Sequence, residues 1–170
     1  LCLPRLLNRF RAAKNLKELQ EQIANFASSM AEKLRQQKSV VTEMAVFAYT
    51  NRFKENLPQT HASSLVSFTT PTSDQRTIIT NAVQATCRLF RSGYGYKKAG
   101  VIATDIMDQD DMVQSMFDDT EAIEKERLIT STLDAINRTY GEGAIKLAVQ
   151  GSGHIKTTSE KQSPHYTTRW

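Results

Sequence analysis

A cluster of cations and tyrosines between residues 88 and 98 is the group of side chains whose chemistry is easiest to interpret. Its cations are Arg88, Arg91, Lys97 and Lys98, and they flank Tyr94-Gly95-Tyr96. Lysine and arginine neutralise phosphates, and such contacts hold a protein on a nucleic acid without reading its sequence. Spacing alone also allows a second interpretation, in which these cations solubilise the end of a helix and complement its dipole. A further basic pair, Arg52 and Lys54, would extend the patch.

The other polar groups do not form a recognisable site. The aspartates Asp108, Asp110, Asp111, Asp118 and Asp119 fall in a segment without periodicity, which we interpret as a solvated spacer. The histidines at 61, 154 and 165 lie in predicted loops, where neither acids nor cysteines are spaced to share a metal. Glycine-rich 93–100 precedes a strand instead of opening a helix, so it does not fit a phosphate-cradling loop. We therefore predict no enzymatic site, metal or other cofactor in this chain.

Charge is distributed unevenly along the 170 residues. The net charge of +4 divides into +8 over residues 1–107, −7 over 108–126 and +3 over 127–170. A basic body attracts polyanions, so nucleic acid is the first partner class to consider. No apolar run approaches the roughly 20 residues that span a bilayer, and no membrane partner is predicted. Two cysteines are too few for a disulfide framework, which favours a reducing, cytoplasmic location.

Hydrophobic periodicity predicts five elements in the first two thirds of the chain. In chain order they are a helix over 15–34, strands over 40–49 and 64–70, a helix from 72 that ends at Gly93, and a strand over 99–106. Val41, Ala45, Phe47 and Tyr49 are expected to share one side of their strand, and Val66 and Phe68 one side of theirs. This order predicts an α+β fold, a ferredoxin-like split β-α-β arrangement without its first strand, in which an antiparallel sheet carries two helices on one face. Its other face would be open.

The last third is predicted to be a separate, smaller unit. Residues 108–119 form an acidic linker, and 120–140 is expected to be a helix that ends at Gly141 and Gly143. The alternation of Ile145, Leu147 and Val149 with Lys146 and Ala148 predicts a strand over 144–149. The extension over 120–170 is therefore expected to be a small α+β domain.

Several segments resemble, in order, the C-terminal part of UmuC-like Y-family translesion DNA polymerases, the catalytic subunits of the DNA polymerase V type. They are Glu32-Lys33-Leu34-Arg35, residues 69–74, residues 96–101, Phe117-Asp118-Asp119 and the C-terminal motif, which contains Ser163, Pro164, Tyr166, Thr167, Thr168 and Arg169. The resemblance runs from about residue 15 to 170. It implies that 15–107 is the little finger, the domain that grips the primer-template duplex during error-prone synthesis in the SOS response to DNA damage.

The resemblance also implies which residues contact DNA. The expected backbone contacts, made without sequence preference, are Thr42, Tyr49, Arg52, Lys54, Tyr96, Lys97 and Lys98. The acidic linker resembles the place where the family carries a sliding-clamp peptide, here Gln114, Met116 and Phe117, with one residue fewer than usual between Gln and Phe. The alternative is a protein-interaction module that docks the clamp or accessory subunits and binds little DNA. An RNA-binding domain of the RRM type is disfavoured, because its aromatic RNP1 pattern is missing.

Two departures from the family pattern lead to further expectations. Residues 1–14 are atypical, and either Leu3 to Phe10 supplies the missing first strand, which is central in a ferredoxin-like sheet, or the sheet is incomplete. The palm, which would hold magnesium in the full polymerase, has no counterpart here. We therefore expect this chain alone not to polymerise DNA, and interpret it as the rear portion of a larger enzyme, from a partial reading frame.

Overall fold

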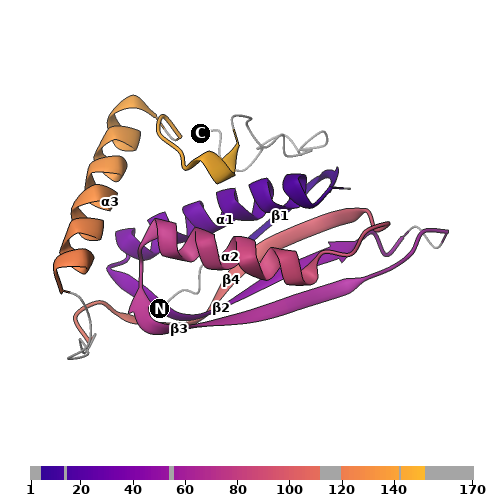
Figure 1. The fold of residues 1–170 in the computed structure, drawn as a ribbon, viewed down its shortest axis with the longest axis horizontal. Helices are drawn as coiled ribbons and strands as arrows, with labels where there is room; N and C mark the ends of the chain where they lie inside the picture. The colour runs from indigo at the N-terminus through magenta and orange to yellow at the C-terminus, as the bar shows by residue number, and fades with distance from the viewer. Residues whose placement is uncertain (1–4, 14, 54–55, 112–119, 142, 152–170) are drawn as a thin grey trace, which may run out of the picture.

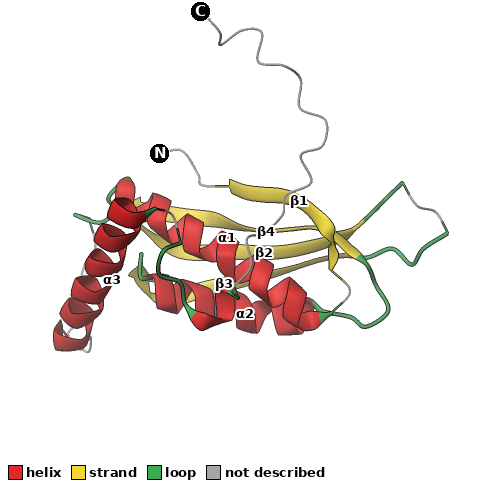
Figure 2. Cartoon of the chain, turned by 90° about the horizontal axis from the view of Figure 1, so that it is seen from above, coloured by secondary structure: helices red, strands yellow, loops and turns green. Residues whose placement is uncertain are grey.

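The computed structural model describes residues 5–13, 15–53, 56–111, 120–141 and 143–151. In chain order the elements are β1 (Arg5–Ala13), α1 (Leu16–Gln36), β2 (Ser39–Thr50), β3 (His61–Thr72), α2 (Gln75–Leu89), β4 (Tyr96–Asp108), α3 (Thr120–Tyr140) and the 3-10 helix η1 (Ala148–Gln150). Helices α1 and α2 lie side by side on one face of the sheet (Figures 1 and 2). The predicted α+β class, with two helices on one face of an antiparallel sheet, is confirmed.

The four-stranded sheet has the order β1-β4-β2-β3, and every neighbouring pair is antiparallel. Strand β1 supplies the strand that the sequence left in doubt. It lies at an edge beside β4, however, and not in the centre as in a ferredoxin-like sheet. The central strands β2 and β4 each have a neighbouring strand on both sides, and among the described side chains of the sheet they contribute most of the buried ones. Edge strand β3 is rich in serine and threonine.

The core lies between the two helices and the sheet. From α1, an apolar stripe of Leu19, Ile23, Met30 and Leu34 is fully buried, as expected for an amphipathic helix on a sheet. The sheet contributes Val41, Met44, Val46, Ala48, Val66, Ala99, Val101 and Ala103, and α2 contributes Ile78, Ile79, Ala82, Ala85 and Leu89. Val66 and Phe68 share the helix-facing side of β3 as predicted.

An irregularity in β2 reverses one of the predicted side assignments. The pairing of β2 with both neighbours is irregular between Val41 and Met44. Val41 and Met44 are three residues apart, yet both belong to the core beneath the helices. The prediction that Val41 shares a side with Ala45, Phe47 and Tyr49 is therefore wrong, because a strict two-residue alternation does not survive a bulge.

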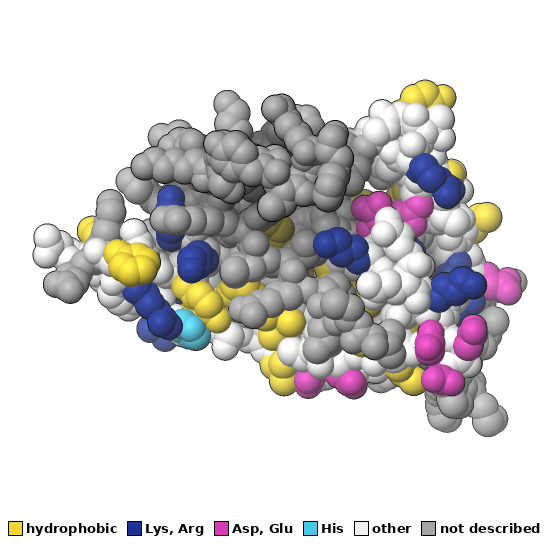
Figure 3. Space-filling view, turned by 180° about the vertical axis from the view of Figure 1, so that it is seen from behind, with side chains coloured by type: hydrophobic (Ala, Val, Ile, Leu, Met, Phe, Trp, Pro, Cys, Tyr) yellow, Lys and Arg dark blue, Asp and Glu magenta, His cyan; other side chains and the backbone are white. Residues whose placement is uncertain are grey.

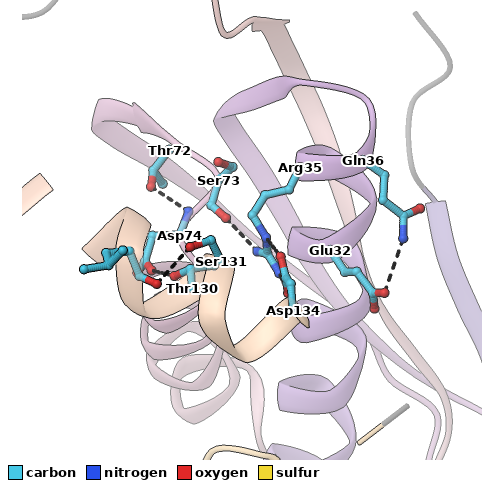
Figure 4. Close-up of polar contacts among 10 residues, drawn as sticks. Glu32, Arg35, Gln36, Thr72, Ser73, Asp74, Thr130, Ser131 and Asp134 are labelled. Atoms are coloured by element: carbon cyan, nitrogen blue, oxygen red, sulfur yellow. Dashed lines mark hydrogen bonds and ion pairs between the residues drawn. The ribbon is translucent and has the colours of Figure 1, made fainter. Parts of the chain in front are cut away.

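Helix α3 has the predicted bounds and packs on the body through polar groups. The Arg35 guanidinium donates two hydrogen bonds to the Asp134 carboxylate, at 2.6 and 2.7 Å, and a third to Ser73 O at 3.0 Å. The hydroxyl of buried Thr130 donates to Asp74, the carboxylate that also caps the N-terminus of α2 (Figure 4). Helix α3 is thus attached where α1 ends and α2 begins.

The predicted strand over residues 144–149 is wrong. A turn and η1 occupy this segment. No described strand lies beside it to provide a ladder, so its polar groups find local and side-chain partners. Ile145 N donates to Asn137 Oδ1 at 2.9 Å, Gln150 N donates to Leu147 O at 2.9 Å, and Asn25 donates to Gln150 O at 2.9 Å.

We predict that the Arg35–Asp134 pair holds α3 on the body. Replacing Asp134 with asparagine should raise hydrogen exchange along α3 and lower the unfolding free energy by about 1 kcal/mol, because a charge-assisted, bidentate pair is lost. A double-mutant cycle with Arg35→Gln, followed by urea denaturation, measures the coupling. Glu124→Gln, at an exposed position of the same helix, is the control. Additive single effects would contradict the prediction.

Candidate nucleic-acid interface

The face of the sheet opposite the helices carries the side chains available to a large ligand. Register places Lys98, Tyr49 and His61 in one row across β4, β2 and β3, since Tyr49 pairs with both of the others. The next rows toward the far end of the sheet are Gly100, Phe47 and Ser63, and then Ile102, Ala45 and Leu65. This surface is called the open face below.

Charge is unevenly distributed on this side of the molecule, although Lys and Arg side chains are also in view toward the right of Figure 3. In Figure 3, the described side chains at the left end, where the loop between β2 and β3 lies, include Lys, Arg and His. The Asp and Glu side chains in view lie along the lower edge and toward the right. We define the basic end as Arg52, Lys97 and Lys98 together with Tyr49 and His61. The acidic end comprises Glu43, Asp105, Asp108, Asp110 and Asp111.

A bulge in β4 places two lysines at the basic end. Tyr49 pairs with Lys98, and Thr50 pairs with Tyr96, so Lys97 is an extra residue without a partner on β2. A bulge lets two consecutive side chains avoid the usual alternation. Tyr96 and Ala99 are both in the core, whereas Lys98 is exposed and Lys97 half-buried. Both predicted lysines therefore lie outside the core.

Tyr96 is a core residue, which corrects its prediction as a DNA contact. Its side chain has no exposed surface. The Tyr96 hydroxyl accepts a hydrogen bond from Arg91 N at 2.8 Å and donates one to Leu89 O at 3.3 Å. Its ring lies 5.8 Å from that of Phe90. The tyrosine thus ties the start of β4 to the end of α2 and has no surface to offer a phosphate.

Thr42, another predicted DNA contact, lies at the acidic end, which makes it a less suitable candidate. Its hydroxyl is hydrogen-bonded to the Asp105 carboxylate at 2.5 Å. Tyr49 lies seven positions along β2 from Thr42, a distance of about 23 Å. Nearby Glu43 accepts hydrogen bonds from Ser67 and Thr104 at 3.3 Å each. Carboxylates surround Thr42, and a phosphate would be repelled there.

Tyr49 and Arg52, two more of the predicted contacts, lie at the basic end. Tyr49 is half-buried on the open face, and Arg52 is exposed in the loop that follows β2. Two hydrogen bonds of Thr50 close this loop at its base. The Thr50 N–H donates to Thr60 O at 3.1 Å, and the Thr50 hydroxyl donates to Gln59 Oε1 at 2.8 Å. The remaining predicted contact, Lys54, lies outside the described residues.

His61 is a residue of the interface that the sequence interpretation assigned to a loop. It is instead the first residue of β3. Its ring stacks on Tyr49, with centroids 3.8 Å apart and planes inclined by 12°, and Tyr49 in turn lies 5.0 Å from Phe47. The alternation of exposed and covered residues in β3 begins at His61. This alternation could have shown that β3 begins at His61. It is hard to recognise in the sequence, because alanine and serine differ little in hydrophobicity.

Other predicted site residues cannot be placed. Gln114, Met116 and Phe117 lie outside the described residues, as does the C-terminal motif of Ser163, Pro164, Tyr166, Thr167, Thr168 and Arg169. Clamp binding therefore stays a prediction. Within the described part of the chain, no three His, Cys, Asp or Glu side chains are grouped to hold a metal ion. None of the described helices has the length and apolar character needed to cross a membrane.

Comparison with known proteins identifies two family domains. Residues 8–116 match the C-terminal domain of the impB/mucB/samB family, and residues 127–170 match a domain of unknown function, DUF4113. Protein UmuC of Salmonella typhimurium is 33% identical over 154 residues, which are 90% of this chain and 36% of that protein. Protein MucB of Escherichia coli is 30% identical over 158 residues, or 92% of this chain and 37% of that protein. The chain thus spans little more than a third of the length of these curated relatives.

One solved structure resembles the chain in shape. It comes from the complex of the beta-clamp processivity factor and the little finger domain of PolIV. The TM-score is 0.45 at 10% sequence identity, and the similarity covers 70% of this chain and 99% of that one.

Proposed function

This chain belongs to the impB/mucB/samB family, and on that basis we propose that it is the DNA-gripping C-terminal part of a translesion DNA polymerase. It binds the primer-template duplex through the phosphate backbone and without sequence preference. The observation that carries the proposal is the basic end of the open face, where Arg52, Lys97 and Lys98 are gathered by a loop and a bulge.

The acidic end restricts where a DNA duplex can lie on the sheet. Phosphates attracted by the basic end are repelled by Glu43 and Asp105 at the other end of the same strands. The duplex is therefore expected to lie across the loop end of the sheet rather than along its whole length. Because phosphate contacts position a protein without identifying bases, this arrangement suits an enzyme that must bind every sequence.

The middle of the open face explains the absence of sequence preference. Its described side chains include Ala45, Phe47, Leu65 and Ile102, with Ser63 at the edge strand. Reading base edges needs side chains such as arginine, asparagine or glutamine that form paired hydrogen bonds. Among the described residues of β2, β3 and β4 on this face, none between the two charged ends is of these types, although Arg5 of β1 pairs with Ile102 in one of the rows.

We predict a strong salt dependence for DNA binding. If about four phosphates are contacted, the logarithm of the association constant should fall with the logarithm of salt concentration at a slope of about −3.6. Fluorescence anisotropy with a labelled primer-template, titrated at several salt concentrations, measures the slope, and two unrelated duplex sequences test the lack of preference. Absence of binding at low salt would contradict the proposal. Docking of the clamp or accessory subunits would then be the better account.

A further inference from the structure

We propose that the basic end also holds an unpaired nucleotide of single-stranded DNA, whose base stacks on the His61 ring. Its phosphates would lie beside Lys98 and Arg52. This inference rests on the proposed function and deepens it, because it names the part of a primer-template that this end of the sheet recognises. The relevant part is the single strand next to the duplex.

The His61 ring is presented as a platform by the ring beneath it. His61 is exposed, Tyr49 is half-buried and Phe47 is only 2% exposed. The aromatic rings therefore form a series on the open face that runs from central strand β2 to edge strand β3. The 3.8 Å, nearly parallel stack on Tyr49 holds the outermost ring in one orientation. A ring that is already ordered loses little conformational entropy when a base packs on it.

Cations lie close enough to serve the phosphates of a nucleotide held there. Lys98 is exposed and lies on the other side of Tyr49 from His61 in the same row, so two strand spacings, about 10 Å, separate it from His61. Arg52 follows Tyr49 by three residues and is also exposed. Next to it in the loop, the Phe53 side chain is 90% exposed and adds a further aromatic ring at this end. Interleaved aromatic rings and cations are the common means by which proteins bind single strands without sequence preference.

An unpaired base fits this arrangement better than a base pair. Bases within a duplex are stacked on one another and offer no free π-face, so a duplex can use only the cations. Open sheets with aromatic side chains stack unpaired bases in other nucleic-acid-binding folds. The aromatic series at this end therefore adds binding energy only where the strand is single.

The test compares two DNAs with the full chain. One is a blunt duplex, and the other is the same duplex with a single-stranded 5′ extension of about six thymidines, within the range of nucleotides that one small domain covers. We expect the extended DNA to bind more tightly. His61→Ala should weaken binding of the extended DNA by about tenfold and leave the blunt duplex within about twofold, because a tenfold loss lies within the range for stacking of one base on an aromatic side chain. His61→Phe should retain the preference.

A fluorescent base provides a direct readout of stacking. With 2-aminopurine in the extension, the wild-type chain and His61→Phe should change its emission on binding, and His61→Ala should not. Ser63→Ala, on the same face of β3, is the matched control and should behave as wild type. Thermal melting of each variant verifies that it is folded.

The outcomes separate the inference from the function on which it rests. If the wild-type chain binds both DNAs equally, or if His61→Ala weakens both equally, the stacking site is contradicted while duplex binding stands. If His61→Phe loses the preference as His61→Ala does, a flat ring is not what binds, and the inference also fails. If the wild-type chain binds neither DNA at low salt, the proposed function itself is overturned.

Discussion

Replacing Lys97 and Lys98 together with alanine should lower the affinity for duplex DNA by about tenfold or more at low salt. The slope of the salt dependence should also become shallower by about 1.8, since each phosphate contact contributes about 0.9. Both lysines are outside the core, so the fold should not suffer. Anisotropy titrations at several salt concentrations, together with a melting curve, measure the two effects.

A matched pair of lysines separates local contacts from net charge. Lys17 and Lys33 are exposed on α1, in the helix layer on the other side of the sheet. Alanine at both positions removes the same two charges from the molecule. We expect this control to change the slope little. Equal losses in the two double variants would mean that the whole field of the protein attracts DNA and that the basic end is not the contact surface.

Tyr96→Ala should lower the free energy of unfolding by about 3–5 kcal/mol, the range for a large aromatic side chain removed from a core. The Tyr96 ring has no exposed surface, and its hydroxyl links Arg91 N to Leu89 O. Tyr96→Phe should cost about 1–2 kcal/mol, because it leaves the Arg91 N–H without its partner. Urea denaturation measures both losses.

The same phenylalanine variant decides between a core and a DNA-contacting role for Tyr96. A core residue predicts that Tyr96→Phe binds DNA as the wild type does under conditions where both are folded. Tyr94→Phe, in the loop that leads into β4 and partly buried against the core, is the matched control for removal of a hydroxyl. Weaker DNA binding by Tyr96→Phe with unchanged stability would restore the interpretation of Tyr96 as a contact.

Single positions of strand irregularity account for two of the differences between prediction and structure, those at Val41 and Tyr96. The bulge at Lys97 allows Tyr96 and Ala99 to face the same side, and the irregular pairing after Val41 does the same for Val41 and Met44. A bulge depends on how the neighbouring strand pairs, and the sequence of one strand does not contain that information. Beyond a bulge, every residue of the strand faces the opposite side of the sheet from the one that strict alternation predicts.

Local sequence determined the helices and the order of elements. The apolar stripe of α1, the bounds of α3 and the hairpin-forming strands β2 and β3 all follow from hydrophobic spacing and turn residues, because helices and hairpins form from contacts close in the chain. The uneven charge along the chain likewise indicated a basic body. The regular alternation of apolar residues over 144–149 led to a wrong strand prediction. A strand also requires the edge of a neighbouring strand, and the described residues provide none beside this segment.

Only the tertiary structure determined which cationic and aromatic side chains lie together at the basic end. Arg52 and His61 come from one hairpin, whereas Lys98 lies far along the chain in β4, and cross-strand register brings Lys98 to the same end of the open face. The edge position of β1 and the attachment of α3 through Arg35 and Asp134 were decided in the same way. Long-range pairing is set by the packing of the whole core. The sequence by itself therefore determined that this protein has a basic surface, and the fold decided which residues compose it.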